Sequence, residues 1–155
     1  MGKKYSKYHV DISDKGKAER TAFDRKSQKQ VLFDSKLEKQ YYLEIICGGL
    51  DSGIITDYEL QKRYILQPSY KHDGKTIRAI DYVADFWIKF ADGSEKIIDT
   101  KGGLVDSVAK LKRKLFWNIY PELDYEWVTY TKATGWINWD EYEAIKKKRK
   151  KEKNS

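Results

Sequence analysis

The chain has 155 residues, a length typical of one compact domain, and a formal net charge of +7 from 31 basic and 24 acidic residues. It has no apolar run of the roughly 18 residues that a membrane-spanning helix needs, and its polar start does not resemble a signal segment, so a cytoplasmic protein is expected. The single cysteine, Cys47, excludes an intrachain disulfide and a cysteine-based zinc scaffold.

The charge is unevenly distributed. Residues 1–30 carry a net charge of +5, residues 146–155 carry +6, and the stretch between them carries −4. Basic ends around an acidic middle suit a protein whose ends hold phosphates while its core keeps carboxylates for another purpose. Anionic membranes and RNA are alternative partners for such ends, and the lysine-rich tail could also be a solvated helix end.

Composition suggests three parts along the chain. Residues 1–30 are polar, lysine-rich and without sustained periodicity, which predicts a basic flexible arm. Residues 31–137 hold nearly all the periodic segments and form the expected folded domain. Residues 138–155 form a C-terminal helix that runs into the basic tail.

The periodic segments predict a mixture of helices and strands. A helix is expected from about Ser35 to Gly48, followed by extended segments over 54–58 and 63–67. A turn at 72–75 then leads into one long strand over 77–90.

A second tight turn at Asp92-Gly93 returns the chain as a strand over 95–101. A basic amphipathic helix over 106–119, a strand over 125–131 and a last helix from Trp139 complete the chain. The fold class expected is α/β.

Strand alternation places polar residues on one face of the segment 77–90. Tyr82, Ala84, Phe86 and Ile88, with Ile80 and Phe90, form an apolar face, whereas Asp81, Val83, Asp85 and Trp87 form a mixed face. On the next strand Asp99 and Lys101 are two residues apart and point the same way. If the hairpin pairs the two strands, Asp85 and Asp99 converge beside Lys101.

Two carboxylates beside a lysine have a chemical meaning. Carboxylate oxygens can hold Mg²⁺, which keeps several waters, and one such water can attack a phosphodiester. A nearby lysine can orient that water or stabilise the charge that develops on the phosphate. The structural alternative is that Asp85 and Asp99 are exposed strand positions and that Lys101 merely pairs with one of them.

Glu38 has two interpretations. The run Ser35-Lys36-Leu37-Glu38 fits a capping box, in which the glutamate serves the start of the helix. Glu38 could instead face the open end of the sheet and complete the shell of a metal ion.

The helix over 106–119 carries an apolar stripe of Val108, Leu111, Leu115 and Ile119, which is expected to face the core. Lys112 falls within this stripe, so it either reaches a phosphate or a carboxylate, or extends to solvent. Three basic residues are expected on the opposite side, as a solvated face or as a track for phosphates: Lys110, Arg113 and Lys114.

Several ordered segments together resemble a known family. Glu38 after Phe33-Asp34-Ser35, then Tyr82-Val83-Ala84-Asp85-Phe86 and Ile98-Asp99-Thr100-Lys101-Gly102 are similar to the signature of the PD-(D/E)XK nuclease superfamily. With Leu66-Gln67-Pro68 and Lys112-Arg113-Lys114-Leu115-Phe116, they resemble small phage proteins assigned to Holliday junction resolvases. Ala84 replaces the proline of the signature, and Asp99 stands where some members have glutamate, which affects the reach to a metal.

The resemblance implies a restriction-endonuclease-like core, a mixed β-sheet flanked by helices in α-β-β-β-α-β order. It implies Mg²⁺, with Mn²⁺ as a substitute, held by Asp85, Asp99, Glu38 and the carbonyl of Thr100, with Lys101 as the catalytic lysine. The substrate would be branched DNA, such as a four-way junction, cut by a homodimer in the cytoplasm of the host cell. The expected DNA contacts are Lys110, Lys112, Arg113, Lys114 and Gln67, with Lys147, Lys148 and Arg149 in the tail.

Three other functions fit parts of the sequence. They are a nuclease for flaps, nicks or mismatches, a non-catalytic nucleic-acid or membrane-surface binder that uses the basic ends, and a nuclease fold without activity that serves protein assembly.

Overall fold

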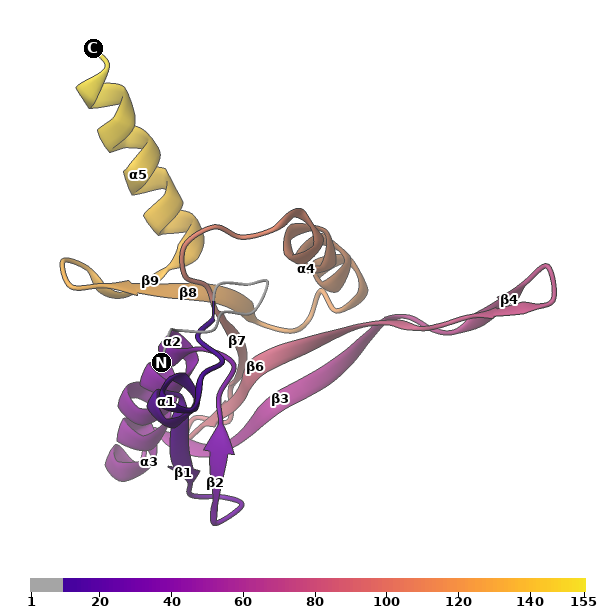
Figure 1. Cartoon of the computed structure of the whole chain (residues 1–155), viewed down its shortest axis with the longest axis horizontal. Coiled ribbons are helices and arrows are strands. Elements are labelled where there is room, and N and C mark those ends of the chain that lie inside the picture. The colour runs from indigo at the N-terminus through magenta and orange to yellow at the C-terminus, as the bar shows by residue number, and fades with distance from the viewer. Residues whose placement is uncertain (1–9) are drawn as a thin grey trace. The chain divides into compact units, whose positions relative to one another are not determined.

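A computed structural model describes residues 10–155 (Figure 1). The chain divides into two compact units, the first ending at Gly49 and the second beginning at Leu50.

The first unit begins with helix α1 (Asp14–Glu19) and the hairpin of strands β1 (Thr21–Asp24) and β2 (Lys29–Leu32). The buried guanidinium of Arg20 donates to the carbonyl of Phe33 at 2.7 Å and so ties this segment down. The prediction of a flexible arm over 1–30 is therefore wrong for residues 14–30, and its first nine residues lie outside the described part. Elements of four to six residues are too short for periodicity to reveal.

The predicted helix at Ser35 is confirmed, and it extends further than expected. The Ser35 hydroxyl accepts from the Glu38 amide at 3.0 Å and begins helix α2 (Lys36–Tyr41). The π-helix η1 (Tyr42–Cys47) and helix α3 (Gly48–Ser52) continue it. Helical structure thus passes Gly48, and it stops before Gly53, whose φ of +78° suits glycine.

The second unit is built on a five-stranded mixed sheet of order β3-β6-β7-β8-β9 (Figure 1). Strands β7 and β8 are parallel, and the other neighbours are antiparallel. The strands are β3 (Ile55–Gln67), β6 (Ile80–Phe90), β7 (Glu95–Thr100), β8 (Tyr125–Thr131) and β9 (Gly135–Asn138).

A separate two-stranded ribbon interrupts this sheet in the chain. Strands β4 (Tyr70–His72) and β5 (Lys75–Ile77) pair with each other and lie between β3 and β6 in sequence. The expected strand over 77–90 therefore begins at Ile80. The predicted turn at 72–75 is confirmed.

The predicted hairpin at Asp92-Gly93 joins β6 to β7. The amide of Gly93 donates to the carbonyl of Phe90, and the Phe90 amide donates to the carbonyl of Ser94 at 2.9 Å. Gly93 has a φ of +88°, which closes a three-residue loop in the usual way.

Two helices complete the second unit. Helix α4 (Ser107–Ile119) packs against β3, and helix α5 (Trp139–Lys153) packs against β8 and β9. The fold class is therefore α/β, as expected, with more elements than the predicted α-β-β-β-α-β order. Within residues 10–155, no helix has the length and apolar character needed to cross a membrane.

Candidate active site

The two predicted carboxylates meet where the ladder between β6 and β7 ends. Backbone pairing stops at Phe86 and Ile98, one position before Asp85 and Asp99. Beyond that point side chains bridge the strands. The Asp85 amide donates to Asp99 Oδ1 at 3.1 Å, and the Thr100 amide donates to Asp85 Oδ2 at 2.8 Å. Each carboxylate is therefore fixed by the backbone of the other strand.

The backbone is irregular at this point on the other side of β6 as well. Strand β3 pairs with β6 on either side of this point, Leu60 with Phe86 and Lys62 with Ala84, so Gln61 lies opposite Asp85. Gln61 has a φ of +54°, an uncommon conformation for a residue that is not glycine. Such outliers cluster at functional sites, although they do not define one.

The packing environment of the buried side chains of β6 also changes at this point. Ala84 belongs to the core beneath α4, and Trp87, three residues later, packs against the same core. Phe86 and Ile88 are fully buried but are not members of that core. Burial alternates along β6 as predicted, with Tyr82, Ala84, Phe86 and Ile88 buried, but these side chains do not all pack in one core. Asp85 lies between Ala84 and Phe86, where this environment changes, and its carboxylate accepts from the Thr100 amide of β7.

Lys101 lies beside Asp99, as predicted. Its Nζ is 2.8 Å from Asp99 Oδ2 and 4.8 Å from the centre of the Trp127 ring. The side chain of Asp99 is 5% exposed and that of Lys101 is 19% exposed. The pair is thus largely buried, with the lysine as its more accessible member.

Aromatic residues surround Asp99, although no pattern in the sequence pointed to them. Asp99 pairs with Trp127 in the parallel register of β7 and β8, and Trp127 Nε1 donates to the Tyr125 hydroxyl at 2.6 Å. Burial, and then the charge of Asp99, raises the pKa of Tyr82 far above its usual value, so its hydroxyl keeps its proton. Burial also raises the pKa of Tyr125. Strand parity could have selected Tyr125 and Trp127 only if the register of β8 had been known.

The residues of the site fit a hard cation in their chemistry. Asp85 and Asp99 supply carboxylate oxygens, and with Lys101 their formal charges leave the site at −1. Each carboxylate offers about four lone-pair positions, and the hydrogen bonds described for it use only some of them. Residues 10–155 contain no group of three or more His, Cys, Asp or Glu side chains arranged for a metal. Mg²⁺ commonly binds through one or two carboxylates and retains waters, so two are sufficient.

Glu38 belongs to the first unit, whereas Asp85, Asp99 and Lys101 belong to the second. Its side chain is buried, with the residue 3% exposed, and its amide donates to the capping Ser35 hydroxyl. The helix-start interpretation of this run is thus supported through the Ser35 cap. The assignment of Glu38 as a metal ligand stays a prediction.

Helix α4 corrects the prediction of its inward face. Val108 and Leu111 are each 58% exposed, and Phe116 is fully buried. Val108, Leu111 and Ile119 of the expected apolar stripe therefore lie outward, whereas Leu115 packs against the core together with Ala109 and Phe116. Lys112 Nζ donates to the main-chain carbonyl of Asp81 at 2.8 Å, so the lysine reaches inward to β6 and binds a backbone oxygen there.

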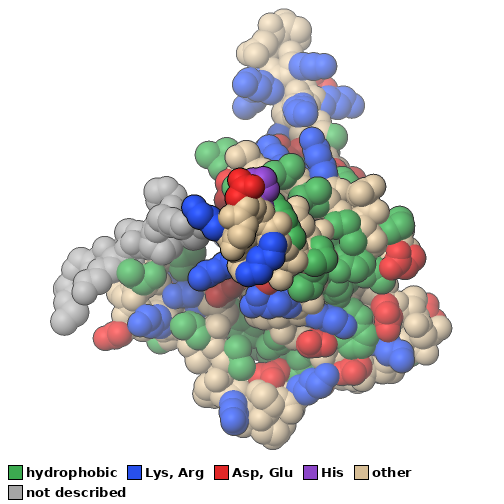
Figure 2. All heavy atoms as spheres, turned by 90° about the vertical axis from the view of Figure 1, so that its right-hand side faces the viewer, with side chains coloured by type: hydrophobic (Ala, Val, Ile, Leu, Met, Phe, Trp, Pro, Cys, Tyr) green, Lys and Arg blue, Asp and Glu red, His purple; other side chains and the backbone are tan. Residues whose placement is uncertain are grey.

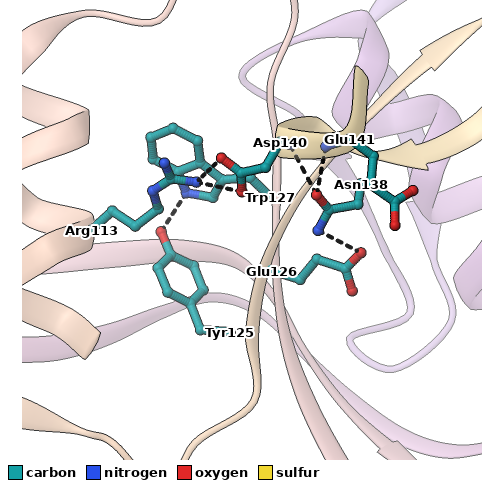
Figure 3. A network of polar contacts seen from close by, with 7 residues as sticks. All are labelled: Arg113, Tyr125, Glu126, Trp127, Asn138, Asp140 and Glu141. Atoms are coloured by element: carbon teal, nitrogen blue, oxygen red, sulfur yellow. Dashed lines mark hydrogen bonds and ion pairs between the residues drawn. The ribbon is translucent and has the colours of Figure 1, made fainter. Parts of the chain in front are cut away.

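Arg113 is held within the protein and not on a solvated face. Its guanidinium lies 3.9 Å from the centre of the Trp127 ring and pairs with Asp140 at 3.0 Å (Figure 3). Trp117 and Trp139 also lie close to it. Figure 3 shows Asn138 nearby, whose side chain accepts from the amides that begin α5 and donates to Glu126. Arg113 therefore joins α4, β8 and α5, so the solvated face expected for it is wrong, and its contact with DNA stays a prediction.

The remaining predicted contacts occupy accessible positions. Gln67 is half-buried at the end of β3, and Lys110 and Lys114 are exposed on α4. The tail residues Lys147, Lys148 and Arg149 are exposed on α5. The structure does not bring these tail residues to the carboxylates.

A protein-family model matches residues 14–135, most of the chain, and is described as "Protein of unknown function (DUF1064)". No curated protein matches the sequence.

Proposed function

For this chain, which belongs to the family described as "Protein of unknown function (DUF1064)", we propose that it is a metal-dependent DNA endonuclease with its active site at Asp85, Asp99 and Lys101. The observation that carries the proposal is the meeting of two carboxylates and a lysine where β6 and β7 part. The resemblance of the surrounding segments to PD-(D/E)XK nucleases supports the same chemistry.

Asp85 and Asp99 would hold Mg²⁺, together with the main-chain carbonyl of Thr100. The chemistry that Mg²⁺ supplies when bound is neutralisation of phosphate charge and activation of a water. Mn²⁺ favours the same oxygen ligands and is a suitable substitute.

The chain's own residues hold the reacting groups in place. The amides of Asp85 and Thr100 fix the two carboxylates before any substrate arrives, so little rearrangement is needed. Lys101 lies close to Asp99, and its ammonium group can donate to a phosphate oxygen as negative charge builds there. The buried aromatic residues beside Asp99 limit the access of bulk water.

We further propose branched DNA, such as a four-way junction, as the substrate, and a homodimer as the active form in the host cell cytoplasm. Symmetric cutting of two strands requires two active sites, which a two-fold dimer supplies. These finer statements depend on the resemblance to phage junction resolvases and on the basic tail, whose exposed lysines suit DNA phosphates.

The test compares a synthetic four-way junction, a flap and a plain duplex, each with Mg²⁺ or with a chelator. Wild type should cleave the junction only with the metal, and Asp99→Ala should not cleave it. Binding without any metal-dependent cleavage would contradict the enzyme and favour a non-catalytic binder. Equal cleavage of all three substrates would contradict junction selectivity but leave the nuclease in place.

A further inference from the structure

The ribbon of β4 and β5, residues 70–77, projects beyond the ends of β3 and β6 (Figure 1). Its turn is formed by Asp73 and Gly74, with φ values of +48° and +74°. This pattern of two positive φ values closes a tight two-residue hairpin. Every residue of the ribbon is exposed except Ile77, which is half-buried. An isolated two-stranded ribbon is marginally stable in water, so a surface that covers it would stabilise it.

The two faces of the ribbon differ in chemistry. The register pairs Lys71 with Thr76, and Lys71 Nζ donates to the Thr76 hydroxyl at 2.6 Å. By strand parity, Arg78 continues this polar face beyond the end of β5. The opposite face is mixed and carries the pairs of Tyr70 with Ile77 and of His72 with Lys75. The polar face thus presents only hydrogen-bonding groups, with a lysine and an arginine among them.

The charge of this region is positive. Between residues 68 and 79 there are three Lys or Arg side chains, at Lys71, Lys75 and Arg78, and a single carboxylate, at Asp73. Figure 2 views the molecule from the side to which the ribbon projects and shows basic side chains gathered around its end. The net positive charge of residues 68–79 suits a polyanion, and Asp73 at the turn does not reverse it.

The dimensions suit one kind of polyanion. The major groove of B-form DNA is about 12 Å wide and admits a two-stranded ribbon, whereas the major groove of A-form RNA is too deep and narrow for side chains to read. Lysine and arginine on a ribbon face are suited to guanine edges and to the phosphates of the groove walls.

The chain also sets a distance to the candidate active site. From Asp85 to the start of β6 at Ile80 is five residues of strand, about 17 Å at 3.3 Å per residue. Continuing to Lys75 brings the separation along the chain to at most about 33 Å. At 3.4 Å per base pair, these lengths correspond to about five to ten base pairs.

We propose that the ribbon binds in the major groove of a DNA duplex, about five to ten base pairs from the phosphodiester at the candidate active site. This inference rests on the proposed function for the location of the cut. The binding of the ribbon to a duplex does not depend on cleavage.

The experiment uses the full chain carrying Asp99→Asn, so that DNA is bound and not cut. The test variant adds Lys71→Ala and Arg78→Ala on the ribbon. The matched control instead adds Lys89→Ala and Lys132→Ala, which remove the same charge at exposed positions of the sheet away from the ribbon. Affinity is measured on junctions with arms of about twenty base pairs and about four base pairs, and on an RNA duplex.

The ribbon variant should bind the long-armed DNA roughly tenfold more weakly, which is the usual effect of removing one or two specific interactions with bases or phosphates. The control should change little, and on short arms the two variants should bind alike. Dimethyl sulfate should reveal guanine N7 atoms in the major groove that the parent protects and the ribbon variant does not, about five to ten base pairs from the cut.

Each of the other possible results contradicts a named part of these proposals. Equal affinities of the ribbon variant and the parent for long arms would overturn the ribbon proposal, as would equal losses of affinity in the ribbon variant and the control. An equal loss of affinity for RNA would overturn the major-groove proposal and assign the ribbon to backbone charge in general. Ribbon-dependent binding in these variants, together with no cleavage of any DNA by the wild-type chain with Mg²⁺, would overturn the proposed function and leave the ribbon proposal standing.

Discussion

Two cations contact the ring of Trp127, and they differ in what their ion pairs connect. Arg113 lies 3.9 Å from the ring centre and pairs with Asp140, so it joins α4 to the start of α5. Lys101 lies 4.8 Å from the same centre and pairs with Asp99, two residues before it in the chain. The first pair links distant segments, and the second links none.

This difference separates stability from chemistry. Burying charged groups is costly unless the pair brings a compensating gain. Arg113 gains packing against tryptophan rings and links three elements. The pair of Lys101 and Asp99 brings no such link, and a second carboxylate, Asp85, approaches the same point. These differences favour a chemical role for the pair of Lys101 with Asp99 and a structural role for the pair of Arg113 with Asp140.

The largest expected effect is on cleavage. Asp99→Asn should lower the cleavage rate by at least about 100-fold, the loss that follows removal of one electrostatic group from an active site. The free energy of unfolding should change by no more than about 1 kcal/mol, because Asn keeps an oxygen for the Asp85 amide and relief of the paired carboxylate charges offsets the lost ion pair with Lys101. Single-turnover cleavage and urea unfolding measure the two effects. A large loss of stability would assign this pair to structure.

The opposite behaviour is expected of Arg113. Arg113→Met should lower the free energy of unfolding by about 1–3 kcal/mol, through weaker packing against the tryptophan rings more than through the missing pair with the half-exposed Asp140. Cleavage by the folded variant should change only a few-fold. Lys114→Met, at the exposed neighbouring position, is the control. An unchanged free energy of unfolding in Arg113→Met would contradict the structural role assigned to Arg113.

A smaller effect is expected from deletion of residues 146–155. The deletion leaves the pair of Arg113 and Asp140 in place, so the midpoint of unfolding should hardly move. Binding to DNA should weaken about tenfold, and the slope of log K against log salt should become shallower by about 0.9 for each phosphate that the tail no longer neutralises. Titrations at several salt concentrations measure the slope. An unchanged slope would show that the tail does not hold DNA.

The smallest effect concerns Tyr64, which packs edge-on against Phe116 and Tyr120 on the α4 side. Burial, and then the charge of Glu59, raises the pKa of Tyr64 to about 12. Since this exceeds the unfolded value of about 10, its stabilising contribution is complete below pH 10 and is lost as the pH rises towards 12. Tyr64→Phe should therefore reduce the fall in stability between pH 9 and pH 11, measured by urea unfolding. The exposed Tyr70→Phe is the control, and equal slopes in the two variants would contradict the prediction.

Much of the sheet and its hairpin could be predicted from the sequence. Asp92-Gly93 specifies the loop chemically, and alternation before and after it places Asp85 and Asp99 on neighbouring strands. The caps Ser35 and Asp106 fix two helix starts in the same local way. These features depend on residues close together in the chain.

Other features required contacts that local patterns do not contain. The inward face of α4 is set by the fit of Phe116 against Tyr82 and Tyr125, although Val108 and Leu111 are no less apolar. Trp127 reaches Asp99 through the parallel register of β8, which is set across the intervening helix α4.

The left-handed backbone of Gln61, which lies opposite Asp85 in the ladder between β3 and β6, has a mechanical consequence. Tyr82 and Ala84, before Asp85, belong to the core beneath α4, whereas the buried Phe86 and Ile88 after it do not. The Asp85 carboxylate thus lies between two buried side chains, Ala84 and Phe86, that pack in different surroundings. A substitution that disturbs either set of buried side chains is therefore expected to move the backbone that positions the Asp85 carboxylate against the Thr100 amide.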